Sequence, residues 1–446
     1  MSTHANLTKS EIRPLNVLYI GIDSISRLNF IRTMPKTHEF LANTGWVDFK
    51  GYNKIGDNTF PNLVAILTGK QYSVAKCFPT QIGCIDKYGF IWTDYQKLGY
   101  VTAYAEDESS INTFNFNKKG FSQKPTDYYF RTYAVAMDHL KKKKVDEMDY
   151  CTGPESSGER ILNTAKDFIN TFIDYPNFGF FWMNSFSHNK LNSPTRMDTK
   201  VAKFLEDIYE SGYFNHSVII FLSDHGIRFG NVRSTRTGWL EERLPYLFLW
   251  FPKWFQDKYP EKYYNLKVNA KSRLTTPYDL YMTIQDVLVL SGFKYNIKSS
   301  EGCAACSSLL DQLPSRSCED VAIDTHWCTC FGYKNVDVNQ EIVKRASNFV
   351  VNNINNVITS HSSVAKKCAK YSLSKVTRAA ISIGKSNASK AYLLIIVETM
   401  PEAVFESTVT VVNGSITDRS YLSRLDSYFA HSRCVVGDLQ KYCYCK

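Results

Sequence analysis

Histidine and long apolar runs are scarce in this sequence. Only 9 of its 446 residues are histidine, and none lies between His225 and His326. No apolar run reaches the ~18 residues that a membrane-spanning helix needs, so we expect no transmembrane segment in this chain. With 44% hydrophobic and 22% charged residues, the composition excludes disorder, collagen-like repeats and coiled coil. The length predicts one large domain and a smaller one.

Cysteine is absent from the first 76 residues, although the chain has 12 cysteines in all. They are dense in two later segments, 303–330 and 434–445. Four sequons for N-glycosylation are also present, at Asn6, Asn215, Asn387 and Asn413. Together these features favour a glycoprotein that is cross-linked by disulfides and lies outside the cell or in the lumen of the secretory pathway.

Two other interpretations of the cysteines stay open. The chain could be cytosolic, with reduced and scattered thiols, or some cysteines could bind zinc. The spacing does not match a zinc ribbon, and the candidate ligands are Cys303, Cys306, His326, Cys328 and Cys330. Residues 1–13 lack the apolar segment of a signal peptide. For a secreted protein we therefore expect a longer precursor, or a leader or anchor that is not present in this chain.

Short apolar runs alternate with helical periods over residues 14–295. The apolar runs predict strands at 16–23, 101–105, 178–183, 218–222 and 244–251. The helical periods predict helices at 34–44, 60–68, 160–175, 201–213 and 278–291. This order predicts an α/β layered domain, with a mostly parallel sheet flanked by helices, over residues 14–295.

The remainder of the chain has a different pattern. Residues 296–340 form a cysteine-rich connector without clear periodicity. In residues 341–446, the β-rich runs 391–397 and 405–412 are separated by Met400-Pro401. We expect a small α+β C-terminal region there, with an antiparallel sheet and flanking helices.

Acidic residues stand at the ends of two predicted strands. Asp23 follows one apolar run, and Asp224 and His225 follow another. In open α/β sheets, ligands bind beyond the carboxyl ends of the strands, and carboxylates with an imidazole suit Zn²⁺ or Mn²⁺. Thr59 opens a predicted helix, where backbone N–H groups favour anions. A metal nearby would lower the pKa of its hydroxyl and make it a nucleophile.

In this order the motifs resemble the alkaline phosphatase superfamily, which includes sulfatases, nucleotide pyrophosphatases/phosphodiesterases and phosphoethanolamine or glycerophosphate transferases. Within it, the sequence is most similar to a sulfatase-like family of animal proteins. The resemblance covers about residues 14–335. The stretches that carry it are 16–27, 57–62, 187–188, 223–230, 238–245 and 326–330.

The resemblance implies a role for each matching residue. Asp23, Asp224 and His225 match metal ligands, and Thr59 matches the nucleophile, which also contacts the metal. Sulfatases instead convert a cysteine or serine to formylglycine within a Cys/Ser-x-Pro-x-Arg motif. Threonine cannot give that aldehyde, because its Cβ carries a methyl group, and no arginine follows at the matching position. The Thr-Phe-Pro-Asn sequence is similar to the phosphodiesterase branch.

Two-metal members of the superfamily add an Asp-x-x-x-His pair and a late histidine, and this sequence matches neither. We therefore expect one divalent ion, Zn or Mn, as in the phosphoethanolamine and glycerophosphate transferases. His188 is then a candidate to protonate the leaving group or to bind a phosphoryl oxygen, with a structural role as the alternative. Asn189 stands where an acid would strengthen metal binding.

Several residues near the motifs are candidate contacts for an anionic substrate. They are Arg27, Asn58, Lys70, Asn189, Arg228 and Arg233. The net charge of +10 is compatible with an anionic ester but does not identify it. Because the basic residues are dispersed and no nucleic-acid-binding motif is present, we expect no nucleic-acid partner.

The sequence therefore predicts a metal-dependent hydrolase or transferase that acts on phosphate esters in preference to sulfate esters. The substrate stays open among glycans, lipid head groups and nucleotides. Thr59 attacks, and a covalent intermediate forms. One alternative is a sulfuric ester hydrolase. The other is a catalytically degenerate secreted protein that binds a glycan or a partner.

Overall fold

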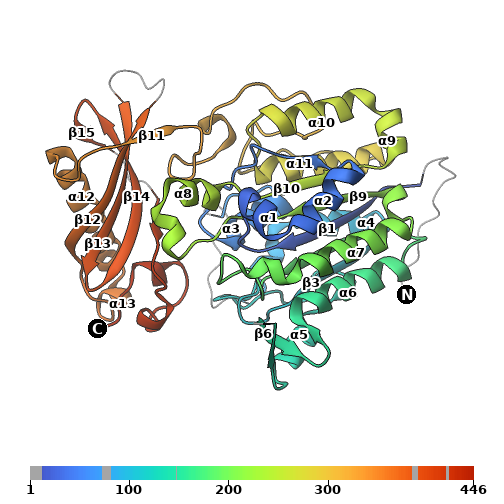
Figure 1. Ribbon diagram of the computed structural model, residues 1–446, viewed down its shortest axis with the longest axis horizontal. Coiled ribbons are helices and arrows are strands. Elements are labelled where there is room, and N and C mark those ends of the chain that lie inside the picture. The colour runs from blue at the N-terminus through green and yellow to red at the C-terminus, as the bar shows by residue number, and fades with distance from the viewer. Residues whose placement is uncertain (1–12, 73–81, 147, 384–389, 418–420) are drawn as a thin grey trace. The chain divides into compact units, whose positions relative to one another are not determined.

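The computed structural model describes residues 13–72, 82–146, 148–383, 390–417 and 421–446 (Figure 1). The chain divides into two compact units. The first contains residues up to 227 and 240–322, and the second contains residues 228–239 and 323–446. The sequons at Asn6 and Asn387 lie outside the described residues, whereas Asn215 and Asn413 are exposed.

A seven-stranded sheet forms the first unit, in the order β2-β10-β9-β1-β8-β3-β4. Strand β1 pairs in parallel with β8 and β9, and β3 pairs in parallel with β8 and β4. Strand β10 runs antiparallel to β9 and β2, so the sheet is mixed and mostly parallel, as predicted. The strand bounds are β1 (Asn16–Ile22), β2 (Val47–Asp48), β3 (Val101–Glu106), β4 (Tyr128–Tyr129), β8 (Asn177–Met183), β9 (Ser217–Leu222) and β10 (Leu247–Trp250).

Helices cover both faces of this sheet, because its central strands are apolar on both sides. Val17 and Tyr19 of β1 belong to one apolar cluster, which includes residues of α3, α4, α9, α10 and α11. Leu18 and Ile20 belong to the other, which includes residues of α1, α2, α6 and α7. The helix bounds are α1 (Arg27–Thr33), α2 (Pro35–Thr44), α3 (Thr59–Thr68), α4 (Ile91–Lys97), α6 (Ser157–Thr171), α7 (Asp198–Glu210), α9 (Lys253–Lys258), α10 (Pro260–Ser272) and α11 (Pro277–Leu290).

Local sequence explains where several of these helices begin. Ser156 and Glu159 form a capping box at α6, and Thr276 and Asp279 form one at α11. A peripheral three-stranded sheet and one more helix complete the unit. Their bounds are α5 (Arg131–Asp138), β5 (Lys143–Val145), β6 (Met148–Thr152) and β7 (Glu155–Ser156), and α8 (Arg236–Arg243) spans the boundary between the units.

The second unit is an antiparallel sheet with one long helix. Its strand order is β11-β12-β13-β14-β15, and β16 also pairs with β14. Apolar residues of α12, among them Val350 and Ile354, share a buried cluster with Ile395 and Phe405 of the sheet. The element bounds are β11 (Gly332–Asn335), α12 (Glu341–Ser360), α13 (Ser362–Ala365), β12 (Ser372–Ile383), β13 (Lys390–Met400), β14 (Ala403–Val412), β15 (Ser415–Ile416) and β16 (Leu422–Arg424).

Disulfides join many of the later cysteines. Cys303 bonds to Cys306, Cys368 to Cys443, and Cys434 to Cys445, so the pair Cys303 and Cys306 is not a zinc site. None of the helices described here has the length and apolar character to cross a membrane.

Candidate functional site

Two strand ends and one helix start supply the candidate site. Asp23 directly follows β1, and Asp224 and His225 come after Ser223 at the end of the neighbouring strand β9. Thr59 is the first residue of α3, which packs against the same sheet. Parallel pairing of β1 with β9 brings the two acids to one edge of the sheet, as the sequence predicts.

The four side chains lie within contact distance of one another. The Thr59 hydroxyl donates to Asp23 Oδ1 at 3.2 Å and lies 3.5 Å from His225 Nε2. His225 Nε2 lies 3.2 Å from Asp224 Oδ2 and 3.7 Å from Asp23 Oδ1. Asp23, Asp224 and His225 are buried, whereas Thr59 is partly exposed. The hydroxyl is therefore the group that an ester could reach from outside.

Hydrogen bonding orients the imidazole of His225. Its Nδ1 lies 2.8 Å from the carbonyl oxygen of Gly226. Because a carbonyl oxygen only accepts, Nδ1 carries a hydrogen and donates it, and Nε2 is directed at the carboxylates. A lone pair on Nε2 would repel those oxygens, so the geometry calls for a cation among them, either a proton or a metal ion.

The carboxylates of Asp23 and Asp224 lack enough partners of their own. Their Oδ2 atoms are buried and accept no assigned hydrogen bond among the described residues. His225 Nε2 lies 3.2 Å from Asp224 Oδ2, but it donates only when the ring is protonated. Burial raises the pKa of Asp224 to about 6, and the nearby negative charge of Asp23 adds to the rise. Burial also raises the pKa of Asp23, although the positive charge of His188 opposes the rise. Two buried acids with free oxygen lone pairs fit a divalent cation.

The backbone between the two acids is constrained. Ser24 has a φ of 63°, an uncommon value for a residue with a side chain. In this conformation its backbone N–H donates to Asp224 Oδ1 at 3.2 Å, and its hydroxyl donates to Asp23 Oδ1 at 3.1 Å. One residue thus fixes both carboxylates, and the strained backbone is located where ligands would bind.

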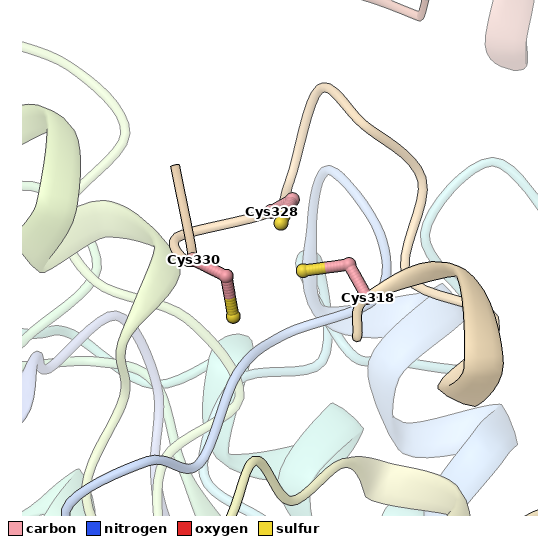
Figure 2. Close-up of side chains that lie close together, drawn as sticks. All are labelled: Cys318, Cys328 and Cys330. Atoms are coloured by element: carbon pink, nitrogen blue, oxygen red, sulfur yellow. The ribbon is translucent and has the colours of Figure 1, made fainter. Parts of the chain in front are cut away.

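Three groups of side chains in the described part of the chain bring potential metal ligands within 4.8 Å of one another. Two are cysteine groups. Figure 2 shows Cys318, Cys328 and Cys330, of which the first two are disulfide-bonded and the third is free. The other cysteine group consists of residues in the disulfides of the second unit. A disulfide sulfur is not a thiolate ligand, so the group with a suitable donor set is Asp23, Asp224 and His225.

A braced loop positions Thr59. Asn62 Oδ1 accepts from the backbone N–H groups of Ile55 (2.8 Å) and Gly56 (3.2 Å), and its amide donates to the carbonyl of Asn58 at 2.9 Å. The asparagine of the Thr-Phe-Pro-Asn sequence therefore ties the start of α3 to the loop before it. Asn58 is the N-cap residue of that helix and is partly exposed.

A buried ion pair supports the same loop. Lys54 pairs with Glu242, and its Nζ donates to the carbonyl of Asp57 at 3.2 Å. Glu242 also pairs with Arg243 at 3.1 Å. Burial lowers the pKa of Lys54 to about 8, an effect that the charges of Glu242 and Asp57 oppose. Sequence reasoning missed this lysine, because its role depends on a residue 188 positions away.

His188 lies in the loop after β8, the strand on the other side of β1. It is partly exposed, and its charge lowers the pKa of Asp23. Its Nδ1 lies 2.8 Å from Oδ1 of Asn189, whose side chain is exposed. Asn189 thus contacts the histidine that the sequence singles out.

The predicted basic contacts already have partners. Arg27 forms an ion pair with Asp48, and Lys70 lies 3.2 Å from Glu301. Arg228 and Arg233 belong to the second unit. Arg228 stacks on Phe229, and Arg233 is buried 3.6 Å from Glu406. Their contact with a substrate stays a prediction.

Sequence reasoning missed the two acids at the end of β3. Glu106 and Asp107 are buried, and β3 pairs with β8, so they lie at the same edge of the sheet as Asp23. The signal was available, because both acids follow the apolar run 101–105 just as Asp23 follows the run before it.

Comparisons with known proteins place this geometry in context. A family described as "Protein of unknown function (DUF229)" matches residues 2–377, and no curated protein matches the chain. Similar solved structures include a protein in the alkaline phosphatase superfamily from Vibrio parahaemolyticus, at 12% identity over 97% of this chain and 86% of that one (TM-score 0.46). The putative sulfatase YidJ from Bacteroides fragilis has 12% identity over 94% of this chain and 90% of that one (TM-score 0.45). The periplasmic domain of EcEptC from Escherichia coli has 15% identity over 69% of this chain and 88% of that one (TM-score 0.45).

Proposed function

We propose that this chain, which belongs to the DUF229 family, is a metal-dependent hydrolase or transferase that acts on phosphate esters through Thr59. The observation that carries the proposal is the position of the Thr59 hydroxyl, 3.2 Å from Asp23 Oδ1 and 3.5 Å from His225 Nε2. The hydroxyl lies at the start of the ten-residue helix α3 and is partly exposed. An ester could therefore reach it from outside while it stays in contact with Asp23 and His225. The helix start also favours the anionic oxygens of a phosphoryl group.

Asp23, Asp224 and His225 would hold a single divalent ion, Zn²⁺ or Mn²⁺, with Thr59 beside it. When bound, the ion would lower the pKa of the Thr59 hydroxyl and offset the negative charge of the phosphoryl group. The Nδ1–H of His225 stays bonded to the Gly226 carbonyl, which keeps Nε2 directed at the site.

The reaction has two displacements. In the first, the Thr59 hydroxyl loses its proton to solvent, Thr59 Oγ1 forms a bond to phosphorus, and the bond from phosphorus to the ester oxygen breaks. His188 gives a proton to the leaving alkoxide. In the second, water or an acceptor alcohol attacks phosphorus, its proton returns to His188, and Thr59 leaves and takes up a proton from solvent. Water as acceptor makes the enzyme a hydrolase, and an alcohol makes it a transferase.

Threonine chemistry favours phosphate esters over sulfate esters. Formylglycine requires a Cβ with two hydrogens to oxidise, and Thr59 has only one. A direct threonine nucleophile suits attack on phosphorus. We propose phosphate esters of glycans or lipid head groups as the substrate class, with sulfate esters as the comparison.

The experiment measures hydrolysis and transfer with a panel of aryl phosphodiesters, aryl phosphomonoesters and an aryl sulfate, at added Zn²⁺ or Mn²⁺. Thr59→Ala should lower turnover by on the order of 10⁴-fold. Thr44→Ala is the matched control, because the Thr44 hydroxyl donates to the Phe40 carbonyl of its own helix α2. Acid quenching should trap a phosphoryl group on the peptide that contains Thr59. Unchanged turnover in Thr59→Ala would end the proposal, and faster cleavage of the sulfate would make the protein a sulfuric ester hydrolase.

We also propose that the protein works outside the cell or in the secretory lumen. The disulfides Cys368–Cys443 and Cys434–Cys445 fit an oxidising compartment, and Asn215 and Asn413 are exposed within sequons. Expression through the secretory pathway should give a product whose mass falls on treatment with an N-glycosidase. A product without glycans, with reduced cysteines, would favour the cytosol.

A further inference from the structure

Two buried acids at the end of β3 hold the loop that carries His188. Asp107 accepts the backbone N–H of Asn184 at 2.7 Å and that of Ser185 at 3.0 Å. It also accepts the Ser185 hydroxyl at 2.6 Å. With a weaker bond from the Asn184 side-chain amide at 3.4 Å, one carboxylate receives four hydrogen bonds from two consecutive residues, directly after β8 ends at Met183. Asp107 therefore fixes the direction in which the chain leaves the strand.

Glu106 fixes the side chain at the start of the same loop. The side-chain NH₂ group of Asn184 donates to Glu106 Oε2 at 3.2 Å, and the side-chain oxygen Oδ1 accepts from Trp182 Nε1 at 3.1 Å. Glu106 is itself held by the backbone N–H of Thr113 at 3.0 Å. Asn184 consequently has partners on both ends of its amide and cannot rotate without losing a buried hydrogen bond.

Backbone hydrogen bonds within the loop connect Asn184 to His188. The backbone carbonyl of Asn184 accepts the backbone N–H of His188 at 3.1 Å and that of Ser187 at 3.3 Å. The residue before Asn184 contributes as well, because the Met183 carbonyl accepts the backbone N–H of Asp23 at 2.9 Å. A tight turn therefore links the β3 acids, His188 and the first acid of the site.

We propose that Glu106 and Asp107 are positioning residues, which hold the turn 184–188 so that the His188 imidazole faces Asp23 and the leaving group. The inference rests on the proposed function of the site. Neither acid contacts the reacting atoms in this arrangement. They act through Asn184 and Ser185, and the loss of either should misplace the general acid without removing the nucleophile. A misplacement of about 1 Å can lower a rate by ~100-fold.

The nature of the leaving group separates positioning from general stability. An alkyl ester needs a proton on its leaving oxygen, whereas a nitrophenyl ester leaves as a stable anion and does not. Asp107→Asn should therefore lower kcat by about 10- to 100-fold for an alkyl phosphodiester and by less than about 3-fold for a nitrophenyl phosphodiester. A purely structural role would lower both rates equally.

The histidine itself provides a readout that does not depend on activity. In full-length protein labelled with ¹³C-histidine, the His188 signal is assigned by its absence from His188→Gln. Asp107→Asn should shift or broaden that signal, and Ser185→Ala should do so more weakly, because only the hydroxyl bond is lost. Ser110→Ala is the control, since Ser110 is exposed and bonds to Glu108 rather than to the turn.

Equal losses for both esters, together with an unchanged His188 signal, would overturn the inference. If Asp107→Asn does not fold, the milder Ser185→Ala decides, with the same two readouts. A wild-type protein that is inactive on both esters, with a shifted His188 signal in Asp107→Asn, would refute the proposed function and leave the positioning of His188 intact.

Discussion

Each unit of the chain buries a histidine beside carboxylate groups, and the two clusters differ in how their charges are balanced. The strand-end cluster is Asp23, Thr59, Asp224 and His225. In it, two carboxylates face Nε2 of one histidine, and an oxygen of each acid has no hydrogen-bond partner among the described residues. The balance of charge there is incomplete without a proton or a metal ion.

The sheet cluster of the second unit is Arg233, His326 and Glu406, with two hydroxyl partners. His326 contacts the Thr408 hydroxyl through Nδ1 at 3.1 Å and the Ser423 hydroxyl through Nε2 at 3.0 Å. Glu406 lies 3.6 Å from Arg233 and 3.9 Å from His326. One acid thus faces a permanent cation, and both ring nitrogens have hydrogen-bond partners, so the charge of this acid is balanced within the chain.

The comparison teaches that burial of an acid with a histidine is not evidence of a metal site by itself. What distinguishes the strand-end cluster is an excess of acceptors over donors at the carboxyl ends of parallel strands. The two clusters should therefore respond in opposite directions when a carboxylate is neutralised.

Glu406→Gln should give the largest effect, a loss of about 3–5 kcal/mol in the free energy of unfolding, because it leaves the buried Arg233 guanidinium without its carboxylate. Urea unfolding at neutral pH measures the loss. The matched control is Glu398→Gln, a partly exposed residue of the neighbouring strand β13, which should change stability by less than about 1 kcal/mol. Equal effects of the two variants would contradict a self-balanced sheet cluster.

Glu106 supplies an intermediate case, since it is buried and hydrogen-bonded near the strand ends. Burial raises its pKa to about 7, against hydrogen bonds from Tyr104, Thr113 and Asn184 that oppose the rise. The unfolded chain therefore loses this proton near its ordinary pKa of 4.5, whereas the folded chain holds it to about 7. Stability from this group is fully present below pH 4.5 and falls by about 3 kcal/mol as the pH rises through 7.

Glu106→Gln should remove that part of the pH dependence. Urea unfolding of wild type and variant across this pH range gives the test, and the difference between the two should grow in favour of the variant as the pH rises. A difference that does not change with pH would show that Glu106 is ionised throughout.

Asp224→Asn should have the smallest effect and the opposite sign to Glu406→Gln. In chelator-treated protein at about pH 8, it should raise the free energy of unfolding by about 1–3 kcal/mol. Its pKa is raised to about 6, so the stability that the protonated acid contributes is lost as the pH rises through that value. Thermal and urea unfolding with and without a chelator check the sign. A loss of stability in the metal-free variant would mean that the carboxylate already has a counter-charge.

The sequence predicted the central sheet because its strands are apolar on both faces. The runs that became β1, β8 and β9 are buried throughout and could hardly adopt another structure. Strand β12 was missed because its pattern is weak: half of its residues are polar, and most of these are exposed. The antiparallel direction of β10 was also not predicted, since an apolar run carries no information about direction.

For the site, the predicted set Asp23, Thr59, Asp224 and His225 lies together because strand ends meet at one edge of a parallel sheet. Their catalytic and metal-binding roles stay predictions. The residues that hold this set in place could not be predicted from the sequence. Asn62 acts through two backbone N–H groups of a loop, and Lys54 through a distant glutamate, and neither relation leaves a local pattern.

The metal content of the purified protein tests the central claim most directly. Chelator-treated protein is dialysed against Zn²⁺, and bound metal is measured together with the unfolding temperature. The account predicts a single ion per chain and a higher unfolding temperature, both lost in His225→Ala and both kept in His326→Gln. No bound ion in wild type, or an ion that survives in His225→Ala and disappears in His326→Gln, would contradict it.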